Sequence, residues 1–433
     1  MNSPAENGVS VDVDQNEFLA EGTRTMDAVV TVQTSDELAV AAPPQQRVEI
    51  LIIDCSGSMG GREKFPNART ATLAALDVMP DGTHFAIVKG TDTATVVYPT
   101  QGASAVANRE SRAAARRALD KLKPDGGTAI GTWLGVSRMI AQKHPGAMVH
   151  AILLTDGKNE HETAERLAEE IRASEGLFTC DCRGVGSDWE PEELRAIASA
   201  LHGTVDIVKT ADLLAKDFAA MMESSMEKTI PELKLRVWTP VGARIVFLKQ
   251  VAPAIENLTA RRVETAPQIG EYPLGAWGAD ERDYHIKIDI DPLAPGGKKL
   301  AARISVFTDA DPLAQGLVKA EWTTDTDLSA PISRGVAHYT GQAELAQVVQ
   351  EGLAARKAGD NATATQKLQR AMHLAHESGN DNTAKLLRGV VDVDDAGTVR
   401  LRAHVDPSDE IALNVRSSKT ARVRPEDRGK GDA

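Results

Sequence analysis

Hydrophobic and polar positions follow two different patterns along this chain. Residues 47–227 contain a short continuous apolar run at 50–53 and two further segments that we expect to be buried strands, at 149–154 and 177–185, separated by segments with helical spacing. Continuous apolar runs are typical of strands that are buried on both faces of a mostly parallel sheet. The alternation of such strands with helices therefore predicts an α/β domain with a doubly wound sheet at 47–227.

The segments on either side of this domain alternate with period two instead. Residues 228–330 carry several half-polar runs, for example at 284–290, separated by turns rich in proline and glycine, and this predicts a β-sandwich. Residues 1–46 contain two similar segments. Because two strands alone are rarely stable, we expect 1–46 to pair with the sandwich, so that the α/β domain is inserted within it.

The C-terminal part changes pattern again. Residues 340–390 have apolar positions at i, i+3, i+4 and i+8, which predicts a helical hairpin similar to a tetratricopeptide unit. A single hairpin of this kind is not stable alone, so we expect it to pack on the sandwich. In 391–433 we expect a short strand pair within 391–415, followed by a mobile, basic-leaning tail from residue 416.

Composition restricts the class of protein. A length of 433 residues predicts two or three domains, and 42% hydrophobic with 26% charged residues is typical of soluble globular proteins. The net charge of −13 argues against nucleic-acid binding. The polar start, the absence of a membrane-length apolar window and the odd number of cysteines, three, predict a reduced, cytoplasmic protein that is not bound to a membrane. The oligomeric state is left open.

Polar residues follow directly after the apolar run at 50–53. Asp54, Ser56 and Ser58 follow in alternate positions, with glycines between and after them. The carboxyl ends of strands are where open α/β sheets bind ligands, and carboxylate and hydroxyl oxygens are ligands that Mg²⁺ accepts. The glycines allow a turn tight enough for these oxygens to converge.

The sequence Asp54-x-Ser56-x-Ser58 after an apolar strand resembles the first segment of the metal-ion-dependent adhesion site in the von Willebrand factor A domain. Two further segments of that family's pattern follow in order. Thr128, within Gly-Gly-Thr, matches the threonine that the family places in a loop, and Asp156, within Thr-Asp-Gly, matches the aspartate after the next central strand. The resemblance covers residues 47–227 and does not extend to the flanking regions with comparable specificity.

The resemblance implies one divalent cation, Mg²⁺, with Mn²⁺ or Ca²⁺ as alternatives. Ser56 and Ser58 would bind it directly, Asp54 and Asp156 directly or through water, and Thr128 from its loop. One coordination position would be left for an Asp or Glu of a protein partner. The donor set lacks the imidazole or thiolate that zinc or copper would favour. We therefore expect a metal-dependent protein–protein interaction module, an adaptor or scaffold, with a Rossmann-like domain.

A metal-dependent hydrolase that uses the same cation is the alternative. Hydrolysis would need a base, and usually a second metal ion or a basic clamp. Arg62, Lys64 and Lys158 are close in sequence to the motif, but no histidine stands beside the metal segments, so we expect no enzyme activity. Each polar residue could also be an ordinary cap or turn residue, although three correctly spaced segments argue against that.

Other residues with possible chemistry have simpler interpretations. We expect Cys55 to point into the core, and Cys180 and Cys182 to be buried thiols. Residues 161–162 do not form a zinc-protease helix, and we expect them to be solvated. We expect Trp189 to pack against the following helix. The glycines after Asp54 lack the spacing of a dinucleotide-binding loop.

Overall fold

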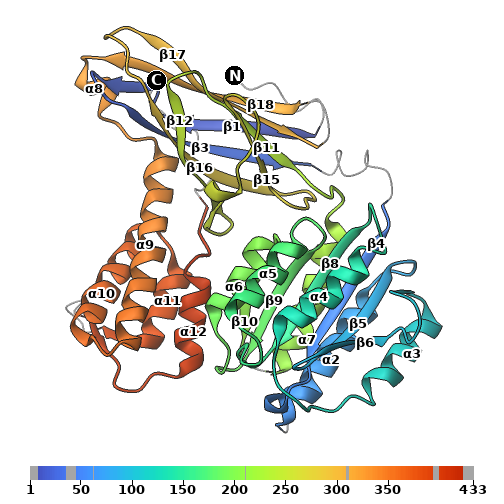
Figure 1. Cartoon of the computed structure of the whole chain (residues 1–433). Helices are drawn as coiled ribbons and strands as arrows, with labels where there is room; N and C mark the ends of the chain where they lie inside the picture. The colour runs from blue at the N-terminus through green and yellow to red at the C-terminus, as the bar shows by residue number, and fades with distance from the viewer. Residues whose placement is uncertain are drawn as a thin grey trace. The chain divides into compact units, whose positions relative to one another are not determined.

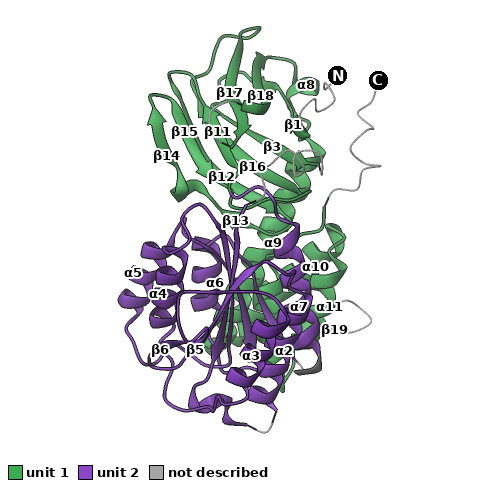
Figure 2. Ribbon diagram, turned by 90° about the vertical axis from the view of Figure 1, so that its right-hand side faces the viewer, with its two compact units in different colours: residues 1–42, 232–433 green, residues 43–231 purple. Residues whose placement is uncertain are grey.

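The structure is a computed structural model that describes residues 8–35, 45–61, 63–209, 211–308, 312–393 and 399–422. The chain forms two compact units (Figure 2): one is Pro43–Pro231, and the other combines Met1–Ala42 with Glu232–Ala433. One unit is thus inserted in the sequence of the other, as the hydrophobic pattern predicted. Within the described ranges, none of the helices is both long and apolar enough to cross a membrane.

The unit 43–231 is built on a sheet in the order β10-β9-β8-β4-β5-β6 (Figure 1). Five of its strands are parallel, namely β4 (Arg47–Asp54), β5 (His84–Gly90), β8 (Met148–Thr155), β9 (Thr179–Val185) and β10 (Val205–Val208). Antiparallel pairing with β5 adds β6 (Ala94–Tyr98) and β7 (Ala105–Val106). Because β4 lies between β5 and β8, the direction of winding reverses there, and the carboxyl ends of β4 and β8 are neighbours.

Helices cover this sheet, and they are α2 (Lys64–Val78), α3 (Arg109–Leu119), α4 (Ile130–Ala141), α5 (Ala164–Ser174), α6 (Pro191–Ala200) and α7 (Ala211–Glu227). Alternate residues of β4, such as Leu51 and Ile53, share one hydrophobic core with side chains of α2, α3 and α7. The intervening residues Ile50 and Ile52 are also fully buried and point to the opposite face. The doubly wound prediction is therefore confirmed.

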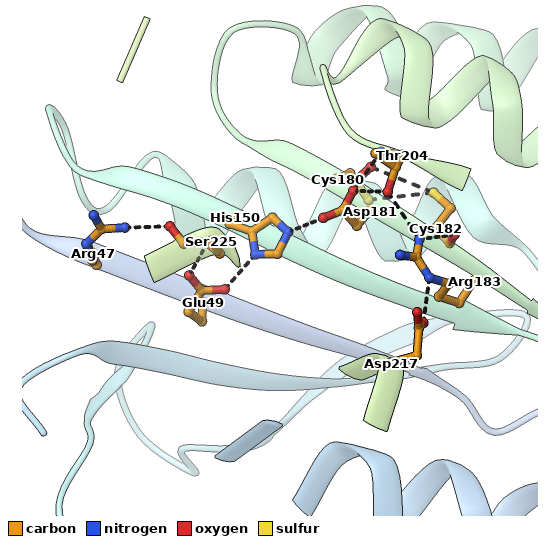
Figure 3. A network of polar contacts seen from close by, with 10 residues as sticks. All are labelled: Arg47, Glu49, His150, Cys180, Asp181, Cys182, Arg183, Thr204, Asp217 and Ser225. Atoms are coloured by element: carbon orange, nitrogen blue, oxygen red, sulfur yellow. Dashed lines mark hydrogen bonds and ion pairs between the residues drawn. The ribbon is translucent and has the colours of Figure 1, made fainter. Parts of the chain in front are cut away.

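A buried polar network attaches α7 to the sheet near the amino ends of the strands (Figure 3). The ring of His150 lies between two carboxylates, with Nδ1 2.7 Å from Glu49 and Nε2 3.0 Å from Asp181. Ser225 of α7 donates a hydrogen bond of 2.8 Å to Glu49. Burial lowers the pKa of His150, but the two carboxylates more than offset this and raise it to about 9. A protonated His150 therefore holds two buried carboxylates together.

The other unit contains a sandwich of two sheets, and strands from both ends of the insertion contribute to it. One sheet has the order β1 (Val9–Gln15), β3 (Thr25–Thr34), β16 (Glu281–Ile290), β12 (Ala243–Ala252), β13 (Glu256–Asn257). The second has the order β14 (Val263–Ala266), β15 (Ile269–Pro273), β11 (Lys234–Trp238), β17 (Lys298–Phe307), β18 (Pro312–Thr323), β2 (Phe18–Ala20). The N-terminal strands pair with β16 and β18, which lie after the insertion.

The C-terminal segment is helical, and its elements are α8 (Thr326–Ser329), α9 (Arg334–Lys357), α10 (Asn361–Glu377), α11 (Asp381–Val390), β19 (Val391–Val393), β20 (Val399–Leu401) and α12 (Pro407–Arg416). The expected hairpin is formed by α9 and α10, and α11 and α12 complete its core. Val336 and Tyr339 of α9 pack with Val29 and Val251 of the sandwich, so the expected packing is confirmed.

Two expectations for the end of the chain are only partly met. The expected short strand pair is present as β19 and β20, but residues 407–416 form the helix α12 instead of continuing it. Pro407 at the first helical position and the Asp406 side chain, which accepts from the Ser408 N–H, start this helix. Residues 417–422 are not a loose tail, because Thr420 donates to the carbonyls of Val251 and Pro253. The rest of the expected tail, 423–433, lies outside the described residues.

Candidate metal centre

The first segment of the candidate site begins at the carboxyl end of β4. Asp54 is the last residue of the strand, and its side chain is fully buried. Its Oδ1 accepts a hydrogen bond of 2.7 Å from the Ser56 N–H, and its Oδ2 accepts one of 2.6 Å from the Thr155 hydroxyl. Burial raises the pKa of Asp54, the hydrogen bonds from Ser56 and Thr155 lower it, and the Asp156 carboxylate raises it further. The Asp54 carboxylate thus holds the backbone at Ser56 in place and connects it to Thr155.

The second segment follows β8, and hydroxyl groups connect it to the first. Asp156 comes directly after the strand and is fully buried. Its Oδ1 accepts a hydrogen bond of 2.7 Å from Ser58, and the Ser58 Oγ lies 2.9 Å from the Ser56 Oγ. The oxygens of Ser56, Ser58 and Asp156 therefore form one continuous group between the two strand ends.

Thr128 reaches the same place from the loop before α4. A Cβ atom added at Gly157 would lie 3.4 Å from both the Ser58 Oγ and the Thr128 Oγ1, so these two hydroxyls approach one point. The Gly57 N–H donates to the Gly126 carbonyl at 3.0 Å and holds the two loops together. All five residues expected at the site are thus brought together at the carboxyl edge of the sheet.

This group of oxygens fits a hard divalent cation. It contains two carboxylates and three hydroxyls and no nitrogen or sulfur donor, the composition that Mg²⁺ and related ions accept. Two buried carboxylates in one site are unfavourable without a positive charge. The chain supplies one, because the Lys64 Nζ lies 2.5 Å from the Asp156 Oδ2. The Lys64 ammonium group therefore offsets part of the buried negative charge at Asp156.

Among the described residues, the basic side chain of Lys64 contacts Asp156, and it has a second partner. Its Nζ also lies 3.5 Å from the Asp188 Oδ2. Burial lowers the pKa of Lys64, but Asp156 and Asp188 more than offset this and raise it. Lys158 instead pairs with Glu190 at 2.8 Å, and Arg62 lies outside the described residues.

The expectation that no histidine lies beside the candidate metal segments is wrong, whereas His161 is exposed and Glu162 is half-buried, in line with the expectation that they are solvated. The His161 Nδ1 accepts a hydrogen bond of 3.1 Å from the Thr128 N–H, and the His161 N–H donates to the Thr128 carbonyl at 3.0 Å. Glu162 accepts from the Gly131 N–H at 2.5 Å, and Asn159 accepts from the Ile130 N–H at 2.7 Å. Segment 159–162 thereby supplies acceptors to the start of α4.

A sequence signal for this arrangement did exist. The residue before α4 is Ala129, whose side chain cannot accept a hydrogen bond from the first turn of the helix. The free N–H groups of a buried helix start must then find acceptors elsewhere in the chain. The sequence could indicate that a partner was needed, but not that Asn159, His161 and Glu162 would provide it.

The three cysteines are buried free thiols, as expected, and Trp189 is buried as well. Cys55 is buried in the core, and burial raises the pKa of its thiol to about 12. Cys180 and Cys182 are buried free thiols with Sγ atoms 3.9 Å apart. Trp189 is buried, and its Nε1 donates to the Gly186 carbonyl at 3.1 Å. These residues belong to the packing of the domain rather than to the site.

Comparisons with known proteins agree with this geometry. The family described as von Willebrand factor type A domain matches residues 48–207, and the von Willebrand factor type A C-terminal domain matches 373–417. A von Willebrand factor type A protein from Catenulispora acidiphila is 47% identical in sequence, with 98% of this chain and 99% of that chain covered and a TM-score of 0.92.

Two more distant proteins are also similar. An uncharacterized protein from Synechocystis sp. is 26% identical over 340 residues, which are 75% of this chain and 77% of that protein. The ArnB paralog VWA2 from Sulfolobus acidocaldarius shares the fold, with 13% identity, 95% and 98% of the two chains covered and a TM-score of 0.59. The family match to the inserted domain and the nearly full-length similarity to the Catenulispora protein show that this chain belongs to the von Willebrand factor type A family.

Proposed function

We propose that this chain is an adaptor or scaffold that binds a protein partner through a divalent cation. The von Willebrand factor type A domain is a general module for metal-dependent protein interaction. The observation that carries the proposal is the convergence of the Ser58, Thr128 and Asp156 oxygens at one edge of the sheet. The cation would be Mg²⁺, with Mn²⁺ or Ca²⁺ as alternatives.

The residues of the site have different tasks in this proposal. Asp54 has both oxygens engaged by Ser56 and Thr155, so it orients the loop and contributes negative charge. Ser56, Ser58 and Thr128 would supply hydroxyl oxygens to the ion. Asp156 would supply a carboxylate from the end of β8. When bound, the ion would provide a positive charge that attracts a carboxylate. Ser58 is exposed whereas Asp156 is fully buried, so an Asp or Glu of the partner would approach from the Ser58 side.

The neighbouring histidine favours binding over hydrolysis. The Nδ1 lone pair of His161 already accepts the Thr128 N–H, so this nitrogen is not available to take a proton from water. In the neutral ring the other nitrogen, Nε2, carries the proton. We therefore propose an interaction module, and hydrolysis through the same cation is the outcome that the experiment below would reveal.

Partner capture tests the proposal. The wild-type chain and the Ser58→Ala variant are immobilised, and binding proteins are compared in Mg²⁺ and in EDTA. We expect a set of proteins that the wild type retains in Mg²⁺, that EDTA releases and that Ser58→Ala fails to retain. Identical capture under all conditions would contradict the metal bridge. A phosphatase or nuclease activity that is lost in Ser58→Ala would instead favour the hydrolase.

A further inference from the structure

We propose that Lys64 is a tethered counter-ion that competes with the divalent cation for Asp156. In the metal-free chain its ammonium group would neutralise the site, and metal binding would displace it toward Asp188. This inference rests on the metal site proposed above. It assigns to the first residue of α2 a role that the resemblance to the family does not supply.

We infer the competition between Lys64 and the metal ion from the contacts of the Asp156 carboxylate. Ser58 donates to the Oδ1 of this carboxylate, and Lys64 occupies the Oδ2 at 2.5 Å. Both oxygens of a fully buried carboxylate are thereby engaged. A cation that takes the Oδ2, directly or through a bound water, must first move the ammonium group away.

The charges of the site explain why such a counter-ion is useful. Asp54 and Asp156 are both fully buried. Without any cation the site would hold two neighbouring negative charges with little solvation, which strongly destabilises a fold. Lys64 supplies one positive charge from within the chain, so the domain remains stable when no metal is bound.

Asp188 offers the displaced ammonium group of Lys64 a second carboxylate with which to form an ion pair. Its Oδ2 lies 3.5 Å from the Lys64 Nζ, and its side chain is 69% exposed, compared with 31% for Lys64 and 0% for Asp156. Lysine is a flexible point charge, so a small rotation can transfer it from the buried carboxylate to the exposed one. The displacement therefore keeps one ion pair instead of leaving the ammonium group without a partner.

Such competition lowers the apparent affinity for metal. Only the fraction of molecules in which Lys64 has left Asp156 can accept the ion, and the apparent dissociation constant rises in inverse proportion to that fraction. Removing the Lys64 charge should therefore tighten metal binding and, in the absence of metal, destabilise the domain. A residue that merely stabilised the loop would not produce these two opposite effects.

The test uses Lys64→Met in the full chain, with Lys158→Met as the matched control. Lys158 lies near the same edge and is paired with Glu190, so its removal changes the local charge equally without touching Asp156. Mn²⁺ affinity is measured by calorimetry, and the melting temperature is measured in EDTA. We expect Lys64→Met to bind Mn²⁺ roughly tenfold tighter than Lys158→Met and to melt at a lower temperature in EDTA. Lys64→Arg, which keeps the charge, should resemble the wild type.

Asp188→Asn provides an independent measurement at an exposed position. It should weaken Mn²⁺ binding in the wild-type background, because Lys64 then has only Asp156 as a partner. In the Lys64→Met background its effect should be much smaller, which a double-mutant cycle reveals.

The outcomes separate the two proposals. If the wild type binds Mn²⁺ and Lys64→Met binds it no tighter than Lys158→Met, the role of Lys64 is overturned and the metal site stands. If neither the wild type nor Lys64→Met binds Mn²⁺, both proposals are overturned.

Discussion

At the scale of single residues, a glycine lies next to the oxygens of the candidate site. Gly157 follows Asp156, and a Cβ there would meet the hydroxyls of Ser58 and Thr128, each at 3.4 Å. The lack of a side chain at Gly157 therefore leaves the space beside these two hydroxyls open.

Gly157→Ala should weaken metal binding while leaving the fold intact. The added methyl group would contact both hydroxyls and occupy part of the space between them, so we expect Mn²⁺ affinity to fall by roughly tenfold or more. Calorimetry measures the affinity, and circular dichroism monitors the fold. Gly61→Ala is the control, because a Cβ at Gly61 has nothing within 4 Å. Equal affinity in both variants would contradict the placement of the ion.

The candidate site residues could be predicted from the sequence, but their neighbours could not. Asp54, Ser56, Ser58, Thr128 and Asp156 were expected from the resemblance to the family's pattern, whose segments occur here in order. Lys64 and Thr155 are also within or beside the motifs, but their contacts depend on which way each side chain points in the folded loop. That direction follows from tertiary packing, which a linear pattern does not contain.

At the scale of elements, segment 159–162 holds the loop that carries Thr128. The His161 Nδ1 accepts the Thr128 N–H, while Asn159 and Glu162 accept the next free N–H groups at the start of α4. Outer partners of this kind orient metal ligands. The position of Thr128 relative to Asp156 therefore depends on acceptors that follow Asp156 in the chain.

Variants of His161 should separate its acceptor function from its bulk. Asparagine can place an oxygen where the Nδ1 lies, so His161→Asn should retain Mn²⁺ affinity. His161→Phe keeps the ring but has no acceptor, and its Mn²⁺ affinity should be lower by about 10–100-fold. Calorimetric titration of both variants is the measurement. Similar affinities in the two would show that Thr128 is positioned without this hydrogen bond.

The link between α7 and the sheet should respond to alkaline pH. The pKa of His150 rises from 6.5 in the unfolded chain to about 9 in the fold. Its contribution to stability is therefore fully present below pH 6.5 and is lost as the pH rises through 9. We expect urea unfolding to show falling stability across this range and a shallower fall in His150→Phe. His144→Phe is the control, and an unchanged slope in His150→Phe would contradict the interpretation.

Periodicity predicted most helices and strands well and failed where the local signal was short. The run 50–53 lies within β4, and the segments expected as strands at 149–154 and 177–185 contain most of β8 and all of β9. The ten residues of α12 were assigned partly to strands, although Pro407 and Asp406 carry a helix-start signal. Its apolar residues Ala412 and Leu413 are buried by contacts with other helices, and such contacts decide the structure of a short segment.

At the scale of the whole molecule, the insertion makes the N-terminal strands part of a sheet that the chain completes much later. β3 pairs with β16 from Thr25 to Gln33, opposite Asp289 to Glu281. Val30 and Val32 of β3 are fully buried. The sequence indicated that these strands needed partners, but their register depends on contacts between residues more than 200 positions apart, which periodicity does not encode.

Removing residues 1–35 should therefore damage one unit selectively. The truncated chain lacks β1, β2 and β3, which exposes the edge of β16 and removes part of the sandwich core. We expect limited proteolysis to cleave within 232–433 far faster than in the full chain, while the unit 43–231 remains protected. Mass spectrometry of the fragments identifies the sites. Equal protection of 232–433 in both chains would contradict this dependence.

The central claim is that a cation binds at the carboxyl ends of β4 and β8, and crystals of the full chain soaked in Mn²⁺ test it most directly. We predict one anomalous scattering peak within coordination distance of Ser58 and Thr128, with the Lys64 ammonium group moved from Asp156 toward Asp188. No peak at this edge of the sheet, or a peak only at other carboxylates, would contradict the claim.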